Sequence, residues 1–206
     1  MHRDPFSRPV GSPAVVLVVI GALLSGCISE SPEIRSSSPP PATLSADAIR
    51  DLASRGRTLD AGTLGSEVRD PDELVQTLDR AGFLVGSERR FSGRIPGPRV
   101  VVARVLVFEN GAGAAAYLNW VTTNTADLIG RNEPRDPLPF GDEPALFVRT
   151  PSGCCPKELP MFFATWRRGS SVLSLMLQGV DAGRARAESI GAELDRVVVS
   201  DETGVA

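Results

Sequence analysis

The side chains with the most reactive chemistry are two adjacent thiols, Cys154 and Cys155, in the segment PSGCCPKELP. Consecutive Cα atoms across a trans peptide lie about 3.8 Å apart, whereas disulfides usually need at least about 4.4 Å. A bond between these neighbours is therefore strained and easily reduced. Three alternatives stay open: a vicinal disulfide that stiffens the loop, a redox or soft-metal site that includes Met161, and a disulfide to a partner protein.

The third cysteine, Cys27, belongs to an N-terminal export pattern. Arg3 and Arg8 precede an eleven-residue apolar run, Ala14 to Leu24, which is too short to cross a bilayer. The tetrapeptide Leu24-Ser25-Gly26-Cys27 then resembles the lipobox of bacterial lipoproteins. That resemblance implies a signal peptide over residues 1–26, diacylation of the Cys27 thiol, and anchoring to the extracytoplasmic face of the cell membrane, for which two acyl chains are sufficient.

Composition restricts the chemistry of the exported chain. The one histidine, His2, lies in the expected signal peptide. A mature chain without histidine has no Ser-His-Asp or Cys-His mechanism and no common His-containing zinc site. We therefore expect a protein that is not an enzyme, with no catalytic residues, no metal and no cofactor.

The charge argues against nucleic acid as a partner. The whole chain has 22 basic and 25 acidic residues; removal of the signal leaves 20 and 24, a net charge of −4. Nucleic-acid-binding domains usually present a basic face. The remaining partners are the membrane, through Cys27, and an unknown small molecule, lipid, glycan or envelope protein.

The segment after Cys27 is typical of a tether. Residues 27–44 contain a run of three serines followed by a run of three prolines, with few large apolar groups, a composition that does not build a core. A single α+β domain is expected over residues 45–200, followed by a frayed tail over residues 201–206.

Periodicity and turn residues predict the order α-α-β-β-α-β-β-β-α, with an antiparallel sheet of about five strands packed by helices. The strongest helix start is Asp70-Pro71-Asp72-Glu73, which combines an N-cap, a proline at the first position and a capping box. The expected helices are 46–55, 71–81, 112–121 and 182–197, and the expected strands are 83–91, 99–109, 144–149, 159–168 and 171–178.

Two short sequence motifs are similar to motifs in extracytoplasmic sensor-like and lipoprotein domains of actinobacteria, including the extracytoplasmic domains of certain receptor kinases. They are Phe140-Gly141-Asp142-Glu143-Pro144-Ala145 and Trp166-Arg167-Arg168-Gly169. The similarity covers residues 70–198. It implies an α+β envelope domain with a cleft for an unknown ligand, and it transfers no catalytic residue.

Three aromatic side chains, Tyr117, Trp120 and Trp166, are the candidate lining of such a cleft, although aromatic residues on a domain helix also serve as core. Two functions follow. The first is a membrane-anchored envelope lipoprotein with a binding domain that is not an enzyme. The alternative is an envelope redox or soft-metal factor that uses Cys154 and Cys155.

Overall fold

The structure, a computed structural model, describes residues 40–50, 52–93, 98–150, 159–179 and 182–203, which all belong to one compact unit, residues 35–206. The strands are β1 Ala53–Leu59, β2 Phe83–Ser92, β3 Pro98–Phe108, β4 Glu133–Arg135, β5 Asp142–Arg149, β6 Met161–Arg168 and β7 Ser171–Gly179. The helices are α1 Ala61–Gly65, α2 Pro71–Arg80, α3 Gly111–Thr123, α4 Thr125–Ile129 and α5 Arg184–Thr203.

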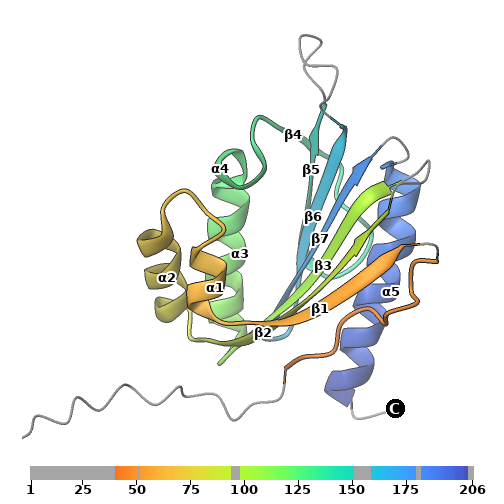
Figure 1. The fold of residues 1–206 in the computed structure, drawn as a ribbon. Helices are drawn as coiled ribbons and strands as arrows, with labels where there is room; N and C mark the ends of the chain where they lie inside the picture. The colour runs from red at the N-terminus through yellow and green to blue at the C-terminus, as the bar shows by residue number, and fades with distance from the viewer. Residues whose placement is uncertain (1–39, 51, 94–97, 151–158, 180–181, 204–206) are drawn as a thin grey trace, which may run out of the picture. The chain divides into compact units, whose positions relative to one another are not determined.

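The seven strands form one antiparallel sheet in the order β1-β2-β3-β7-β6-β5-β4. Helix α5 covers one face, and helices α1 to α4 lie on the other (Figure 1). The α+β class and the antiparallel sheet are as expected, with seven strands where we expected about five.

Strand alternation divides the interior into two cores. On the α5 side, Val105, Leu173, Leu175 and Leu177 pack against Leu194 of the helix. On the other side, the core contains the following residues: Leu59, Leu64, Leu74, Leu78, Leu106, Phe108, Tyr117, Leu118 and Val172. Successive side chains on a strand point to opposite faces. Strands β3 and β7 therefore each contribute side chains to both cores.

The start of α2 is confirmed. The Asp70 carboxylate accepts a hydrogen bond from the Glu73 backbone N–H at 3.2 Å, and Pro71 occupies the first turn. The Glu73 side chain, however, accepts a hydrogen bond from the Trp120 indole N–H at 3.1 Å, 47 residues away. The expected capping-box residue therefore ties α2 to α3.

The expected helix over residues 46–55 is wrong. Residues 46–50 form turns, and residues 53–59 form the edge strand β1, which pairs with β2 over its whole length. The sequence ASRGRTL has no apolar alternation, because an edge strand with charged side chains buries little. Pairing with β2 outweighs the helical spacing of Ile49, Leu52 and Ala53.

Other elements differ from expectation for similar reasons. Helix α1 lies in a segment expected as loop, where the Asp60 side chain caps it, and β4 is an exposed strand of three residues. The expected order α-α-β-β-α-β-β-β-α is thus replaced by β-α-α-β-β-α-α-β-β-β-β-α. The buried face of α5 contains Ala187, Ile190, Leu194 and Val198.

The boundaries of the domain also move. Residues 40–44, expected in the tether, belong to the folded unit: Leu44 is buried, and Pro41 accepts a hydrogen bond from the Ser87 hydroxyl at 2.7 Å. Helix α5 continues to Thr203, beyond the expected frayed start at residue 201. No helix within the described ranges is long and apolar enough to span a bilayer.

Several expectations fall on residues that the structure does not describe. They are the signal peptide, the lipobox with Cys27, residues 28–39 of the tether, and Cys154 and Cys155.

Candidate functional site

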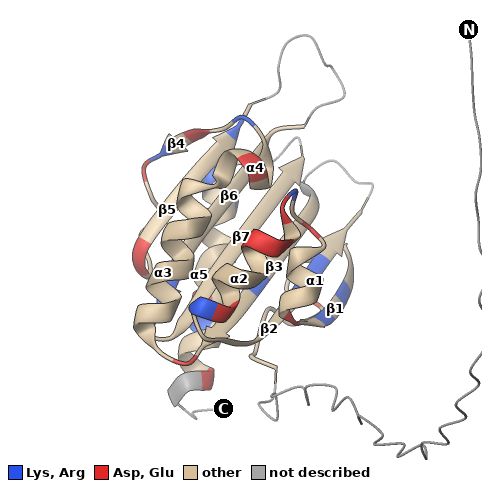
Figure 2. Cartoon of the chain, turned by 90° about the vertical axis from the view of Figure 1, so that its left-hand side faces the viewer, with Lys and Arg blue, Asp and Glu red and all other residues tan. Residues whose placement is uncertain are grey.

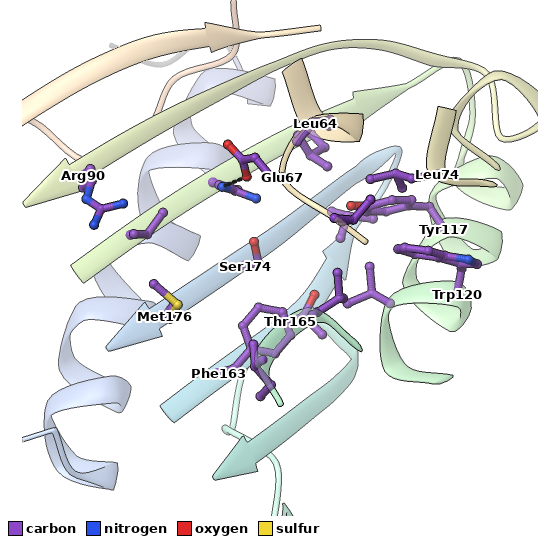
Figure 3. A pocket seen from close by; sticks show the side chains of 18 residues that line it. Leu64, Glu67, Leu74, Arg90, Tyr117, Trp120, Phe163, Thr165, Ser174 and Met176 are labelled. Carbon is purple, nitrogen blue, oxygen red and sulfur yellow. Dashed lines mark hydrogen bonds and ion pairs between the residues drawn. The ribbon is translucent and has the colours of Figure 1, made fainter. Parts of the chain in front are cut away.

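A cavity of about 250 Å³ lies between the inner face of the sheet and helices α1 to α4 (Figure 3). Its lining is mainly apolar and consists of Leu64, Glu67, Val68, Leu74, Arg90, Val102, Arg104, Leu106, Tyr117, Trp120, Val121, Leu128, Ile129, Phe163, Thr165, Val172, Ser174 and Met176. A mostly apolar concavity with a few polar groups is the usual form of a small-molecule site.

The register of the sheet arranges the floor of the cavity in three cross-strand rows. The first row, Arg90-Val102-Met176-Phe163, crosses β2, β3, β7 and β6. The second row, Glu88-Arg104-Ser174-Thr165, is polar. The third row contains Leu106 and Val172, on which α3 packs. From the third row to the first, the floor therefore changes from an apolar row covered by α3, through a polar row, to a partly exposed apolar row that begins at Arg90.

Tyr117 and Trp120 of α3 form one wall of the cavity, with ring centroids 6.1 Å apart. The hydrogen bond from Trp120 to Glu73 fixes the indole orientation. Burial raises the pKa of Tyr117 to about 12, with a smaller opposing effect from the nearby Arg104 charge. The phenol is thus neutral at physiological pH and presents a hydroxyl group.

A cluster of four charged side chains borders the cavity. Glu88, whose side chain is 5% exposed, accepts hydrogen bonds from Arg57 Nε at 2.9 Å and Arg104 Nε at 2.5 Å. Glu67, on the loop between α1 and α2, pairs with the same two arginines. Burial alone raises the pKa of Glu88, but the hydrogen bonds and charges of Arg57 and Arg104 outweigh it, so this pKa is lowered.

Arg90 lies at the opposite end of the cavity from Trp120 (Figure 3). Its side chain is exposed and forms no hydrogen bond or ion pair within the described part of the chain. The hydroxyl of Ser174, in the middle of the floor, likewise has no partner among the described residues. The Tyr117 hydroxyl also forms no hydrogen bond with a described residue, so the lining presents three free polar groups in the described part of the chain.

A second, polar hollow adjoins the cavity at the Trp120 end, and the two share Val68, Trp120 and Leu128. Its charged lining is Arg69, Asp70, Glu73 and Asp127. Figure 2 shows acidic residues gathered at the first turn of α2 and on α4. The two ends of the cavity therefore differ in charge, with Arg90 at one and excess carboxylate at the other.

Of the three aromatic residues named from the sequence, the structure brings Tyr117 and Trp120 together and separates Trp166 from them. Trp166 does not line this cavity. It is fully buried on the α5 face, where its indole N–H donates to Asp195 at 2.9 Å and its ring meets Phe140 at 4.9 Å. The alternation of β6 determines this, because Thr165 points into the cavity and its neighbour must point away.

The floor residues were not identified from the sequence, although one signal was present. In RVVVARVLVFE, Arg104 interrupts an otherwise apolar strand at a position where its side chain shares a face with Val102 and Leu106. A charged side chain within a central strand indicates either a buried ion pair or a functional site. Arg90 and Ser174 carried no comparable signal, because their role depends on register.

The part of the chain that the structure describes contains no group of three or more His, Cys, Asp or Glu placed to hold a metal ion.

The geometry defines an α+β domain, a sheet with helices on both faces and a cavity under α1 to α4. A solved structure with a similar fold is the extracellular domain of PknH from Mycobacterium tuberculosis, with a TM-score of 0.52 and 12% sequence identity over 72% of this chain and 85% of that chain. No protein-family model matches the chain, and no curated protein matches it significantly.

Proposed function

We propose that this protein is a membrane-anchored extracytoplasmic lipoprotein whose domain binds a small molecule in the cavity and does not act as an enzyme. The observation that carries the proposal is the cavity of about 250 Å³ with an apolar lining and three polar groups, Arg90, Ser174 and Tyr117, that have no partner among the described residues. Placement outside the cytoplasm is supported by the lipobox-like Leu24 to Cys27 and by the fold shared with an extracellular domain.

The architecture suits binding better than bond breaking. The carboxylates nearest the floor, Glu67 and Glu88, are both held by two arginines. For Glu88, the hydrogen bonds and charges of Arg57 and Arg104 lower the pKa, which makes this carboxyl a poor proton donor near neutral pH. A general acid needs a pKa near the operating pH, and the lowered pKa of Glu88 is displaced in the opposite direction.

The test is native mass spectrometry of residues 35–206, the unit that contains both cores and the cavity. The protein should be exported and purified without detergent and compared under native and denaturing conditions. We expect a component that travels with the folded domain and is released on unfolding.

Two serine-to-phenylalanine variants make the test specific for the cavity. Ser174→Phe directs a ring into the middle of the cavity and is expected to remove the component, whereas Ser189→Phe places the same ring at an exposed position of α5 and is expected to retain it. If the wild-type domain carries nothing, or if both variants carry the same component, the cavity is not the binding site.

A further inference from the structure

The net charge of the cavity narrows the class of ligand. Within the charged cluster, Arg57 and Arg104 are matched by Glu67 and Glu88, so the four groups together are neutral. Arg90 is then the remaining charge of the lining, and no described residue pairs with it. An uncompensated guanidinium at the end of an apolar cavity favours an anionic group on the ligand.

The same end of the cavity also offers an apolar surface. Val102, Met176 and Phe163 continue from Arg90 in one row across β3, β7 and β6. Met176 and Phe163 are partly exposed, whereas their strand neighbours Leu175 and Ala164, on the other face, are buried. Three strand spacings of about 4.8 Å give this row a length of roughly 14 Å.

The opposite end repels a negative charge. There, Asp70, Glu73 and Asp127 surround the adjoining hollow with Arg69 as the one basic group of its lining. A ligand with an acid group at one end is therefore oriented, with the acid at Arg90, away from these carboxylates, and the apolar part on the row of Val102, Met176 and Phe163 (Figure 3). The Ser174 hydroxyl lies in the adjacent row of the floor and is able to bond a polar group on the chain.

We infer that the ligand is an amphipathic anion, an apolar chain laid across β3, β7 and β6 whose carboxylate or phosphate binds Arg90. This inference rests on the proposed function, because it names the ligand class of the same cavity. Carboxylate and phosphate both match a guanidinium, so the two acids are tested side by side.

The experiment is isothermal titration calorimetry of residues 35–206 with dodecanoate, dodecyl phosphate and uncharged methyl dodecanoate, the two acids kept below their micelle concentrations and the ester below its solubility limit. A charge-assisted hydrogen bond contributes about tenfold in affinity at an exposed position such as Arg90. We expect wild type to bind at least one acid about tenfold more tightly than the ester. The acid that binds more tightly identifies the source, a fatty acid or a phosphate ester.

Arg90→Gln should weaken binding of that acid by about tenfold and leave binding of the ester unchanged. Arg186→Gln is the matched control, since it removes the same charge from an exposed position on α5, on the other face of the sheet. It should leave both affinities unchanged.

Equal binding of acid and ester by wild type would overturn the inference, as would equal losses in the two variants or binding of none of the three probes. These failures are distinguishable from failure of the proposed function. If the ester binds and Ser174→Phe abolishes its binding, the cavity is a ligand site, and only the role inferred for Arg90 is wrong.

Discussion

The buried carboxylate of Glu88 provides the sharpest test of the charged cluster, through the substitution Glu88→Gln. Glutamine keeps the size of the side chain but leaves Arg57 and Arg104 with Glu67 as their one carboxylate in the cluster. Removing one member of a fully buried ion pair costs about 3–5 kcal/mol. Because the Arg57 side chain is 45% exposed and Glu67 remains in place, we expect Glu88→Gln to lower the free energy of unfolding by about 2 kcal/mol at pH 7.

The assay is chemical and thermal unfolding of residues 35–206 between pH 7 and pH 3.5. For a domain of this size, 2 kcal/mol corresponds to a decrease in Tm of about 4–8 °C. The pKa of Glu88 is lower in the folded state than in the unfolded chain, so its contribution is fully present above the unfolded value of about 4.3 and is lost as the pH falls through the folded pKa. The difference between wild type and Glu88→Gln should therefore shrink below about pH 4.3.

Glu193→Gln is the control for this prediction. Glu193 forms an exposed ion pair with Arg196 on α5, with side chains 44% and 67% exposed. Solvent and salt screen such an exposed pair, so it contributes little to stability. If Glu88→Gln destabilises the domain no more than Glu193→Gln, or if its deficit is the same at pH 7 and pH 3.5, the cluster does not stabilise the fold as argued.

Two other predictions concern α3. The chain contains a single tyrosine, so ultraviolet absorbance should report ionisation of Tyr117 near pH 12 in the folded state. Because that pKa is raised by burial, the associated stability should be present below about pH 10 and decline as the pH rises toward 12; ionisation near pH 10 in the folded protein would contradict the placement of the ring. Gly113→Ala would force a Cβ into the carbonyl of Ala81 and should cost about 2 kcal/mol in denaturant unfolding. Gly183→Ala meets no atom within 4 Å and should change stability by less than about 0.5 kcal/mol; equal effects of the two would refute the close approach of α2 to α3.

The sequence predicted the central part of the fold well because its signals are local. The cap at Asp70, the β-branched run of β3, and the tight turn between β6 and β7 each depend on a few adjacent residues. The edges of the sheet were predicted poorly for a physical reason. Strands β1 and β4 expose most of their side chains, so no apolar alternation marks them, and pairing with a neighbour determines their conformation.

The cavity was predicted only in part. Tyr117 and Trp120 were identifiable because large aromatic residues at helical spacing are visible in a sequence. Trp166 belongs instead to a structural group with Phe140 and Gly141, since a Cβ at Gly141 would overlap its indole. The two motifs that resemble extracytoplasmic domains thus meet in the core under α5, which explains why they indicate a fold more directly than a ligand.

The sheet itself explains why a cavity persists beside a well-packed core. Helix α3 covers the apolar row of Leu106 and Val172, but the next row contains Arg104 and Ser174, on which an apolar helix face cannot pack without leaving polar groups unsatisfied. The loop between α1 and α2 reaches over that row through Glu67, which pairs with Arg104. The inner face beyond it, with Met176, stays partly uncovered. The polar row between two apolar rows therefore explains why the helices do not cover the whole inner face of the sheet. It also explains why the uncovered surface suits an amphipathic ligand.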